Sequence, residues 1–194
     1  MSGPCEPPPL SMARRDPDEP KGASVLPPLT GDFVRVVLVG FMGAGKSIVG
    51  RRLARRLKWR FIDVDQRVEQ AAGMSIPQIF ATQGETAFRE LEDKVAQRVL
   101  KGTHAVISTG GGWPVRDDRM AKLPAGTLSV WLVVDAATAV SRASRRFGQR
   151  PLLATDDPMA TARELLAERE PEYARADLHL ITHGSSPEGL VEAI

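Results

Sequence analysis

The stretch Gly40-Phe-Met-Gly-Ala-Gly-Lys-Ser47 decides the fold of this chain, because every position fits the pattern G-x-x-x-x-G-K-[ST]. An apolar run at 36–39 precedes it, and a basic stretch with helical periodicity follows at 49–57. Between a strand and a helix, such glycines let backbone N–H groups turn toward an anion, which the positive helix end also attracts. The sequence predicts a phosphate-binding loop in which Lys46 reaches the outer phosphates and Ser47 holds magnesium. The alternative is a glycine-rich turn without a ligand, which the matching strand, spacing, lysine and serine disfavour.

Length and composition limit the classes of function. The 194 residues suffice for one domain with a sizeable core. The net charge of +2 is divided between −2 over residues 1–32 and +4 over the remainder. A mildly basic body suits anionic small molecules and is too weakly charged to indicate nucleic acid binding. The single cysteine, Cys5, excludes an internal disulfide and indicates a reducing compartment. Without an apolar run of membrane-spanning length, a signal peptide or a transit-peptide pattern, we expect a cytoplasmic protein.

The N-terminal residues differ from the rest of the chain. Residues 1–32 hold eight of the fifteen prolines and few large apolar side chains. Such a segment cannot bury enough apolar surface to offset the entropy of ordering it. We therefore predict a disordered tail over 1–32 and a single domain over 33–194.

The body alternates between strand and helix patterns. We expect strands at 35–39, 60–64, 105–108, 128–134 and 178–182. We expect helices at 46–57, 66–101 with breaks at Gly73 and Gly84, 136–146, 159–175 and from Pro187 onward. The polar segment 147–158 is typical of a loop. This alternation predicts a parallel sheet with helices on both faces and a ligand site at the carboxyl ends of the strands.

Two polar motifs follow the second and third expected strands. Asp63 and Asp65 lie two residues apart, so in an extended chain their carboxylates point to the same side, roughly 6–7 Å apart. Beside a magnesium–phosphate site, Asp63 can hold the metal through water, and Asp65 can accept a proton from an attacking hydroxyl group. Taken alone, such a pair is more often a solvated strand end. Residues 110–112 are three glycines, which let a substrate approach the backbone closely or form a flexible turn.

Three arginines are candidates for binding anionic groups. Arg89 precedes Glu92 by three residues, so the two share a helix face and the carboxylate could orient the guanidinium. If Arg89 and Arg169 converged on one pocket, they would clamp a carboxylate bidentately. Arg150, in the expected loop, could close over phosphates and stabilise charge on a transferring group. The plainer interpretations are surface ion pairs and a solvated loop arginine.

Together these segments closely resemble the shikimate kinases. The resemblance runs from about residue 35 to about residue 193, in the stretches GFMGAGKS, FIDVD, GMSIPQIFATQGETAFRELE, STGGG, RPLL and EREPEYARADL. The phosphate loop is shared by many nucleotide-binding proteins, whereas the whole set in this order is specific to the family. It implies a P-loop kinase-type three-layer α/β fold with a five-stranded parallel sheet and helices on both faces.

The resemblance also implies an activity: ATP-dependent phosphorylation of the 3-hydroxyl group of shikimate, in aromatic amino-acid biosynthesis. ATP is the co-substrate and Mg²⁺ the metal. By the same resemblance we expect a monomer without a nucleic acid or membrane partner, with residues 147–158 as a lid that excludes water.

The resemblance assigns roles to matching positions. Those expected to bind ATP are Gly43, Ala44, Gly45, Lys46, Ser47, Ile48 and Arg150. Those expected to bind shikimate are Asp65, Arg89, Gly110, Gly111, Gly112 and Arg169. Ser47 and Asp63 match the magnesium ligands, and Asp65, as base, would act in catalysis with Lys46 and Arg150.

The chain departs from the family pattern at some positions. Ile48 replaces a hydroxyl residue, with a small expected effect because that contact is mainly through the backbone. Ser185 stands where some members have an adenine-contacting arginine. The spacing before Arg150 leaves open which of Arg142, Arg145 and Arg146 packs against adenine.

Two other functions compete with this interpretation. One is another small-molecule kinase of the same architecture, such as a gluconate or nucleoside monophosphate kinase. The other is a catalytically silent kinase-like domain, which the presence of Lys46, Asp65 and the three arginines disfavours.

Overall fold

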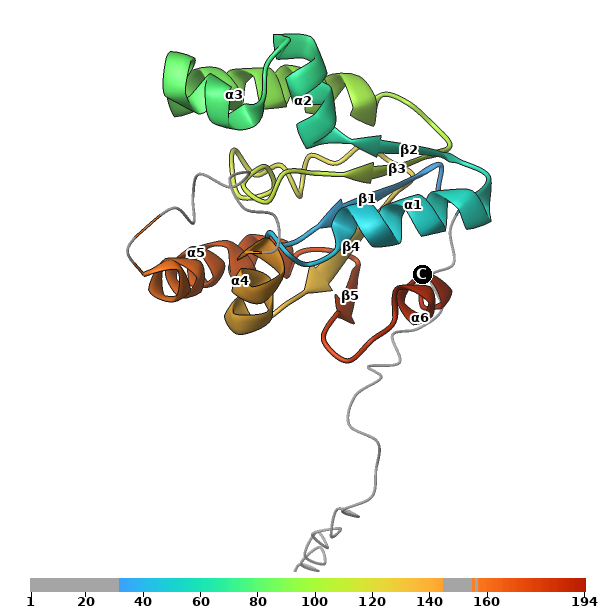
Figure 1. Cartoon of the computed structure of the whole chain (residues 1–194). Coiled ribbons are helices and arrows are strands. Elements are labelled where there is room, and N and C mark those ends of the chain that lie inside the picture. Colours follow the sequence, from blue (N-terminus) through green and yellow to red (C-terminus); the bar gives the residue numbers. More distant parts are fainter. Residues whose placement is uncertain (1–31, 145–154, 156) are drawn as a thin grey trace, which may run out of the picture.

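The structure, a computed structural model, describes residues 32–144, 155 and 157–194. Within these residues five strands form one parallel sheet in the order β2-β3-β1-β4-β5 (Figure 1). The strands are β1 (Arg35–Val39), β2 (Arg60–Asp63), β3 (Ala105–Ser108), β4 (Thr127–Val133) and β5 (Leu178–Ile181). The predicted fold class, a five-stranded parallel sheet between helices, is confirmed.

The helices follow from the connections between parallel strands. They are α1 (Lys46–Leu57), α2 (Val64–Ala72), α3 (Ile76–Leu100), α4 (Ala136–Ser144), α5 (Pro158–Tyr173) and α6 (Pro187–Glu192). The step from β1 to β2 runs across the sheet in one direction, and the steps from β2 to β3 and from β4 to β5 run in the other. Because such crossovers are right-handed, α1 covers one face and α3, α4 and α5 lie toward the other. In agreement, α1 packs against α6, and α4 packs against α5 (Figure 1).

Most predicted element positions agree with the structure. β1, α1 and β3 have the predicted bounds, and the long helical block is broken at both expected glycines. Gly73 ends α2 with a φ of 68°, and Gly84 interrupts α3 with a φ of 82°. Residues 1–31, the end of the expected helix 136–146 and most of the expected lid lie outside the described residues. The tail and the lid therefore remain predictions.

The second strand differs from its prediction in a way that matters for the site. β2 ends at Asp63, which has extended backbone angles, and Val64 already begins α2. Asp65 therefore lies in the first turn of a helix, and the expected alternation of the two acids along an extended chain is wrong. The helix begins early because Val64 and Val68, both fully buried, lie four residues apart on one helix face. A carboxylate in the first turn also interacts favourably with the helix dipole.

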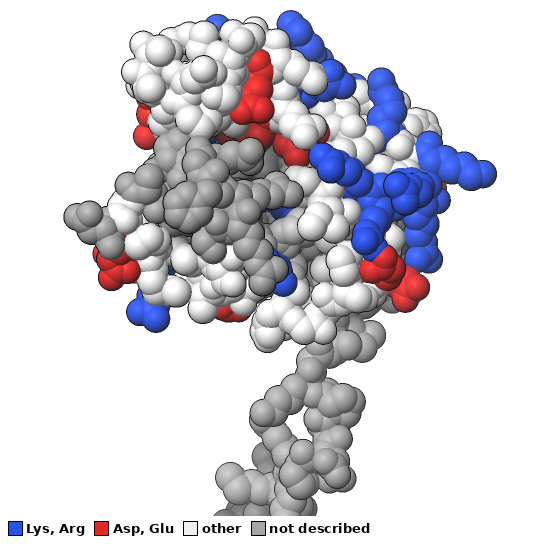
Figure 2. Space-filling model, viewed as in Figure 1, with Lys and Arg blue, Asp and Glu red and all other residues white. Residues whose placement is uncertain are grey.

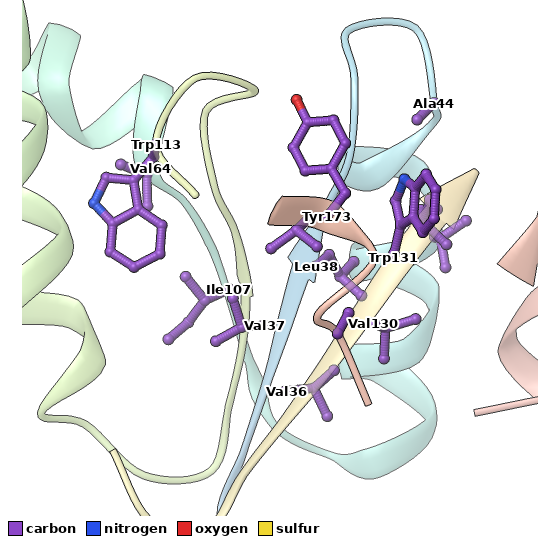
Figure 3. Packing of buried hydrophobic residues seen from close by; sticks show 14 of the residues in the cluster. Val36, Val37, Leu38, Ala44, Val64, Ile107, Trp113, Val130, Trp131 and Tyr173 are labelled. Carbon is purple, nitrogen blue, oxygen red and sulfur yellow. The ribbon is translucent and has the colours of Figure 1, made fainter. Parts of the chain in front are cut away.

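The core surrounds the central strands. β1 is buried along its whole length, as expected for a parallel strand covered on both faces. Figure 3 shows side chains of β1 and β4, including Val36, Leu38 and Val130, gathered in the interior, with Tyr173 beside them. Trp131 and Tyr173 pack with their ring centroids 6.0 Å apart. None of the helices in the described ranges has the length and apolar character needed to span a lipid bilayer.

The basic character of the body is concentrated partly on α1. Its exposed positions include four arginines, Arg51, Arg52, Arg55 and Arg56. Figure 2 shows Lys and Arg side chains gathered over this helix. The opposite face of α1 carries the buried Val49 and Leu53. This is the pattern of a solvated amphipathic helix, so part of the net charge does not bear on the ligand site.

The strand order predicts where a ligand binds. From β1 the chain passes to β2 and β3 on one side, and later to β4 and β5 on the other. In open parallel sheets, ligands bind at the carboxyl edge where the strand order reverses in this way. The glycine-rich loop that follows β1 lies at this point.

Candidate active site

A cavity of about 510 Å³ opens at the carboxyl edge of the sheet. Its lining comes from five regions: the glycine-rich loop and start of α1, the β2–α2 junction, the end of β3, α4 and the segment from β5 to α6. The predicted site residues on its wall are Gly43, Ala44, Gly45, Lys46, Ser47, Ile48, Asp63, Asp65 and Gly111. The sheet topology thus unites three motifs that are far apart in the sequence.

The loop before α1 has the geometry of an anion cradle. Gly43 and Gly45 have φ values of 78° and 92°, which side-chain-bearing residues rarely adopt. A Cβ atom on Gly43 would also lie 2.7 Å from the Ala139 carbonyl oxygen of α4. The N-terminus of α1 has no side-chain cap. No side chain of the described residues thus occupies this helix start, and helix termini of this kind bind phosphate.

Lys46 lies folded over the loop that carries it. Its Nζ atom donates hydrogen bonds to the carbonyl oxygens of Gly40, at 2.7 Å, and Phe41, at 3.1 Å. The ammonium group is thereby held on the cavity side of β1. This position suits neutralisation of phosphate charge beside the cradle.

Ser47 and Asp63 form a set of oxygen donors suited to magnesium. The Ser47 hydroxyl group donates a hydrogen bond of 2.7 Å to Oδ2 of Asp63. No group of three or more His, Cys, Asp or Glu side chains among the described residues could hold a metal alone. Mg²⁺ commonly needs only one or two protein oxygens, because substrate phosphates and water complete its coordination. The two residues therefore fit a magnesium ion that arrives with a nucleotide.

The three glycines after β3 lie among the predicted substrate-binding side chains. A Cβ atom on Gly110 would overlap the Glu92 carboxylate and lie 2.9 Å from Oδ1 of Asp65. One on Gly111 would lie 3.6 Å from Nη1 of Arg169, and one on Gly112 would lie 2.9 Å from Nη1 of Arg89. Asp65, Arg169 and Arg89 thus converge on consecutive residues of one loop, although they come from three different helices.

Arg89 is oriented as the sequence predicts. Its Nη1 atom donates a 2.9 Å hydrogen bond to Oε2 of Glu92, and its Nη2 atom bonds Glu85 at the same distance. Glu92 is fully buried, and this burial raises the pKa of its carboxyl group, although Arg89 opposes the shift. The other carboxylate oxygen, Oε1, has no partner in the described residues. A buried carboxylate of this kind restricts the rotamers of the guanidinium beside it.

Arg169 is nearly as buried as the core. Only 7% of it is exposed, and its guanidinium carbon lies 5.7 Å from the ring centroid of Phe41, a cation–π contact. The desolvated guanidinium lies beside Gly111, where a ligand carboxylate would interact strongly with it. Arg89 and Arg169 do not line the cavity described above; their guanidinium groups lie beside Gly112 and Gly111. Arg150 lies outside the described residues, so its role remains a prediction.

Arg142 and Tyr173 also belong to the site. The sequence did not distinguish Arg142 from two neighbouring arginines, and Tyr173 was not predicted. Arg142 lines the cavity and donates hydrogen bonds to the carbonyl oxygens of Gly43, at 3.2 Å, and Thr182, at 3.3 Å. It therefore joins the phosphate loop to the segment after β5; Arg145 and Arg146 lie outside the described residues. Tyr173 bonds the Gly111 carbonyl group. Its position four residues after Arg169, on the same helix face, was the signal in the sequence.

Comparisons with known proteins agree with this geometry. The family model for shikimate kinase matches residues 42–194. The shikimate kinase of Nitrobacter winogradskyi is 48% identical over 157 residues, which cover 81% of this chain and 73% of that protein. The shikimate kinase of Bradyrhizobium diazoefficiens is 46% identical over 157 residues, covering 81% of this chain and 75% of that protein.

Solved structures are also similar. A shikimate kinase from Acinetobacter baumannii in complex with shikimate has a TM-score of 0.79 at 33% identity, covering 83% of this chain and 90% of that one. A gluconokinase from Sinorhizobium meliloti has a TM-score of 0.53 at only 16% identity, covering 83% of this chain and 89% of that one. At that identity, the second likeness concerns the fold alone.

Proposed function

We propose that this chain, which belongs to the shikimate kinase family, transfers the γ-phosphoryl group of ATP to the 3-hydroxyl group of shikimate. The enzyme is a small-molecule kinase, and its reaction serves aromatic amino-acid biosynthesis. The observation that carries this proposal is the convergence of Asp65, Arg169 and Arg89 on Gly110, Gly111 and Gly112, in that order. One carboxylate and two guanidinium groups are the complement of a molecule with hydroxyl groups and one carboxylate.

The two halves of the substrate complex divide between the two sides of the glycine loop. ATP phosphates occupy the cradle formed by residues 43–48, with Lys46 neutralising their charge. Shikimate lies with its carboxylate between Arg89 and Arg169 and its hydroxyl groups toward Asp65. Asp65 supports this arrangement because it both lines the cavity and lies beside Gly110.

Ser47 directly and Asp63 through water would hold a magnesium ion, which would supply charge neutralisation at the phosphates. The hydrogen bond between these two side chains, 2.7 Å long, supports the assignment.

Catalysis rests on orientation and charge. Asp65 accepts the proton of the attacking hydroxyl group. The oxygen of that hydroxyl group forms a bond to the γ-phosphorus, while the bond between this phosphorus and the ADP oxygen breaks. Lys46, with Arg150 from the lid, stabilises the charge on the transferring group. The lid at 147–158 excludes water, so ATP hydrolysis without acceptor should be slow.

A coupled ADP-release assay tests the proposal. The purified protein is incubated with ATP, Mg²⁺ and one of shikimate, gluconate or a nucleoside monophosphate. ADP release should depend on shikimate and should be slow with the other acceptors. A preference for gluconate or the nucleoside monophosphate over shikimate would defeat the proposal. Binding of ATP and shikimate without turnover would favour a silent kinase-like domain.

We further propose that the protein acts in the cytoplasm as a monomer, on shikimate and ATP, without a nucleic acid or membrane partner. The single cysteine and the modest net charge of +2 support this view. Size-exclusion chromatography with light scattering tests the oligomeric state, and a stable dimer would contradict it.

A further inference from the structure

Tyr173 makes a polar contact from inside the core. It is the only tyrosine of the chain, and its side chain is fully buried. Its hydroxyl group donates a hydrogen bond of 2.5 Å to the carbonyl oxygen of Gly111. Figure 3 shows this hydroxyl group pointing away from Leu38 and Val36, toward the loops at the end of the sheet. The polar atom of a buried side chain is thus bonded to the loop that the proposed acceptor would contact.

The contact lies at the junction of the two substrate halves. A Cβ atom on Gly111 would lie 3.6 Å from the Tyr173 hydroxyl oxygen and 3.6 Å from Nη1 of Arg169. It would also lie 3.5 Å from the Gly40 carbonyl oxygen, which accepts a hydrogen bond from Lys46. Residues 169 and 173, one turn apart on α5, therefore reach the same glycine, and the Gly40 carbonyl group at the start of the phosphate loop also lies beside it.

Holding the Gly111 carbonyl group also orients an amide. The carbonyl of Gly111 and the N–H of Gly112 belong to one planar trans peptide and point in opposite directions. Neither the Gly111 nor the Gly112 amide donates to an acceptor within the described residues. Within that part of the chain, both are therefore available to donate to a ligand. A loop of three glycines has many accessible conformations, so these amides keep one direction only if another group restrains them.

We propose, resting on the function proposed above, that Tyr173 is a positioning residue for the acceptor. Its hydrogen bond fixes the peptide between Gly111 and Gly112, so that the free amides keep a constant orientation beside the Arg169 guanidinium. The acceptor then binds to a loop that is already ordered, and the entropic cost of ordering it falls on folding rather than on binding.

The surroundings of Tyr173 suit this role. Its ring is packed against Trp131, which limits movement of the hydroxyl group. Burial raises the pKa of Tyr173 to about 12, so the hydroxyl group remains a neutral donor throughout the physiological range. Arg169 opposes that shift without cancelling it. Loss of the hydroxyl group would leave the Gly111 carbonyl without this partner, while the phenyl ring would still fill the core.

The test is the substitution Tyr173→Phe, with Ser129→Ala as the matched control. Ser129 is also buried, and its hydroxyl group donates a 2.6 Å hydrogen bond to Asp177 between β4 and β5. Both variants lose a buried hydroxyl group, but only one loses a contact with the glycine loop. We expect Tyr173→Phe to raise KM for shikimate about fivefold to tenfold, the effect of one hydrogen bond, with KM for ATP changed less than twofold. Ser129→Ala should change neither constant by more than twofold.

Amide hydrogen exchange at Gly111 and Gly112, without any substrate, separates this inference from the proposed function. Exchange should be faster in Tyr173→Phe than in the wild type, and unchanged in Ser129→Ala. Unchanged exchange in Tyr173→Phe, or equal rises in both KM values, would overturn the positioning role. If the wild type does not phosphorylate shikimate, the proposed function fails, and the exchange measurement alone decides whether Tyr173 orders the loop.

Discussion

Ser47, in the first turn of α1, donates a hydrogen bond of 2.7 Å to Oδ2 of Asp63, the last residue of β2. The two strands that carry these segments are not neighbours, because β3 lies between β1 and β2. The hydrogen bond therefore joins two motifs across the carboxyl edge of the sheet. It fixes two oxygen atoms beside the phosphate cradle before any nucleotide binds.

The substitution Ser47→Ala should raise the Mg²⁺ concentration needed for half-maximal activity about tenfold, because it removes an oxygen donor that would bind the metal. Activity measured against Mg²⁺ at saturating ATP and shikimate checks this. Ser185→Ala is the control, since Ser185 lines the same cavity but bonds the Ile181 carbonyl. If both variants needed the same Mg²⁺ concentration for half-maximal activity, Ser47 would not be a ligand of the metal.

The substitution Arg89→Lys tests the carboxylate clamp while retaining the positive charge. An alanine here would leave buried Glu92 unpaired, at a cost of about 3–5 kcal/mol, and would confuse folding with binding. Lysine lacks the planar fork that binds a carboxylate bidentately. We therefore expect KM for shikimate to rise at least tenfold, with KM for ATP changed less than twofold. Arg175→Lys, at an exposed ion pair with Asp118 and Glu172, should change neither constant. A parallel rise of both KM values in Arg89→Lys would argue against the clamp.

The substitution Asp65→Asn should lower kcat by about 10²–10⁴, because the amide cannot accept the proton of the attacking hydroxyl group. The side chain keeps its shape, so the thermal midpoint and KM for ATP should stay close to those of the wild type. Asp117→Asn, at an exposed loop position, is the control for loss of a negative charge. Near-normal turnover in Asp65→Asn would exclude Asp65 as the base.

The ionisation of Tyr173 should make stability fall at high pH. Burial raises its pKa from the usual 10.0 to about 12, so between these values the folded protein retains a proton that the unfolded chain has lost. The contribution is fully present below pH 10 and is lost as the pH rises toward 12, amounting to about 2–3 kcal/mol.

Denaturant unfolding across this range should show a steeper loss of stability in the wild type than in Tyr173→Phe. Since Tyr173 is the only tyrosine, near-ultraviolet absorbance reports its ionisation alone. If the absorbance titration of Tyr173 had its midpoint near pH 10 while the protein was still folded, the hydroxyl group would not be buried.

The sequence was sufficient for much of the fold because its signals are local. The phosphate loop, the apolar run of β1 and the periodicity of α1 lie within about two dozen adjacent residues, and their predicted bounds match the structure. The junction of β2 and α2 was predicted wrongly. Alternating acids at 63 and 65 are typical of a strand, but tertiary burial of Val64 and Val68 outweighed this local pattern.

Site residues that lie within a sequence motif could be predicted. Site residues whose roles depend on contacts between distant parts of the chain could not. Arg142 could not be chosen over its neighbours, because its partners Gly43 and Thr182 lie 99 and 40 residues away. Tyr173 was missed because a single tyrosine in a helix usually belongs to the core, which it also does. The acceptor-clamp roles of Arg89 and Arg169, and the lid role of Arg150, remain predictions until substrates are tested.

The packing of Trp131 against Tyr173, with ring centroids 6.0 Å apart, gives the protein an intrinsic optical reporter. One ring belongs to a strand that borders the nucleotide loop, and the other holds the glycine loop. Small shifts of either loop should therefore change the emission of Trp131, one of the three tryptophans of the chain, so acceptor occupancy could be followed without a dye or a coupling enzyme. Inhibitor screening against the free enzyme could use this signal directly.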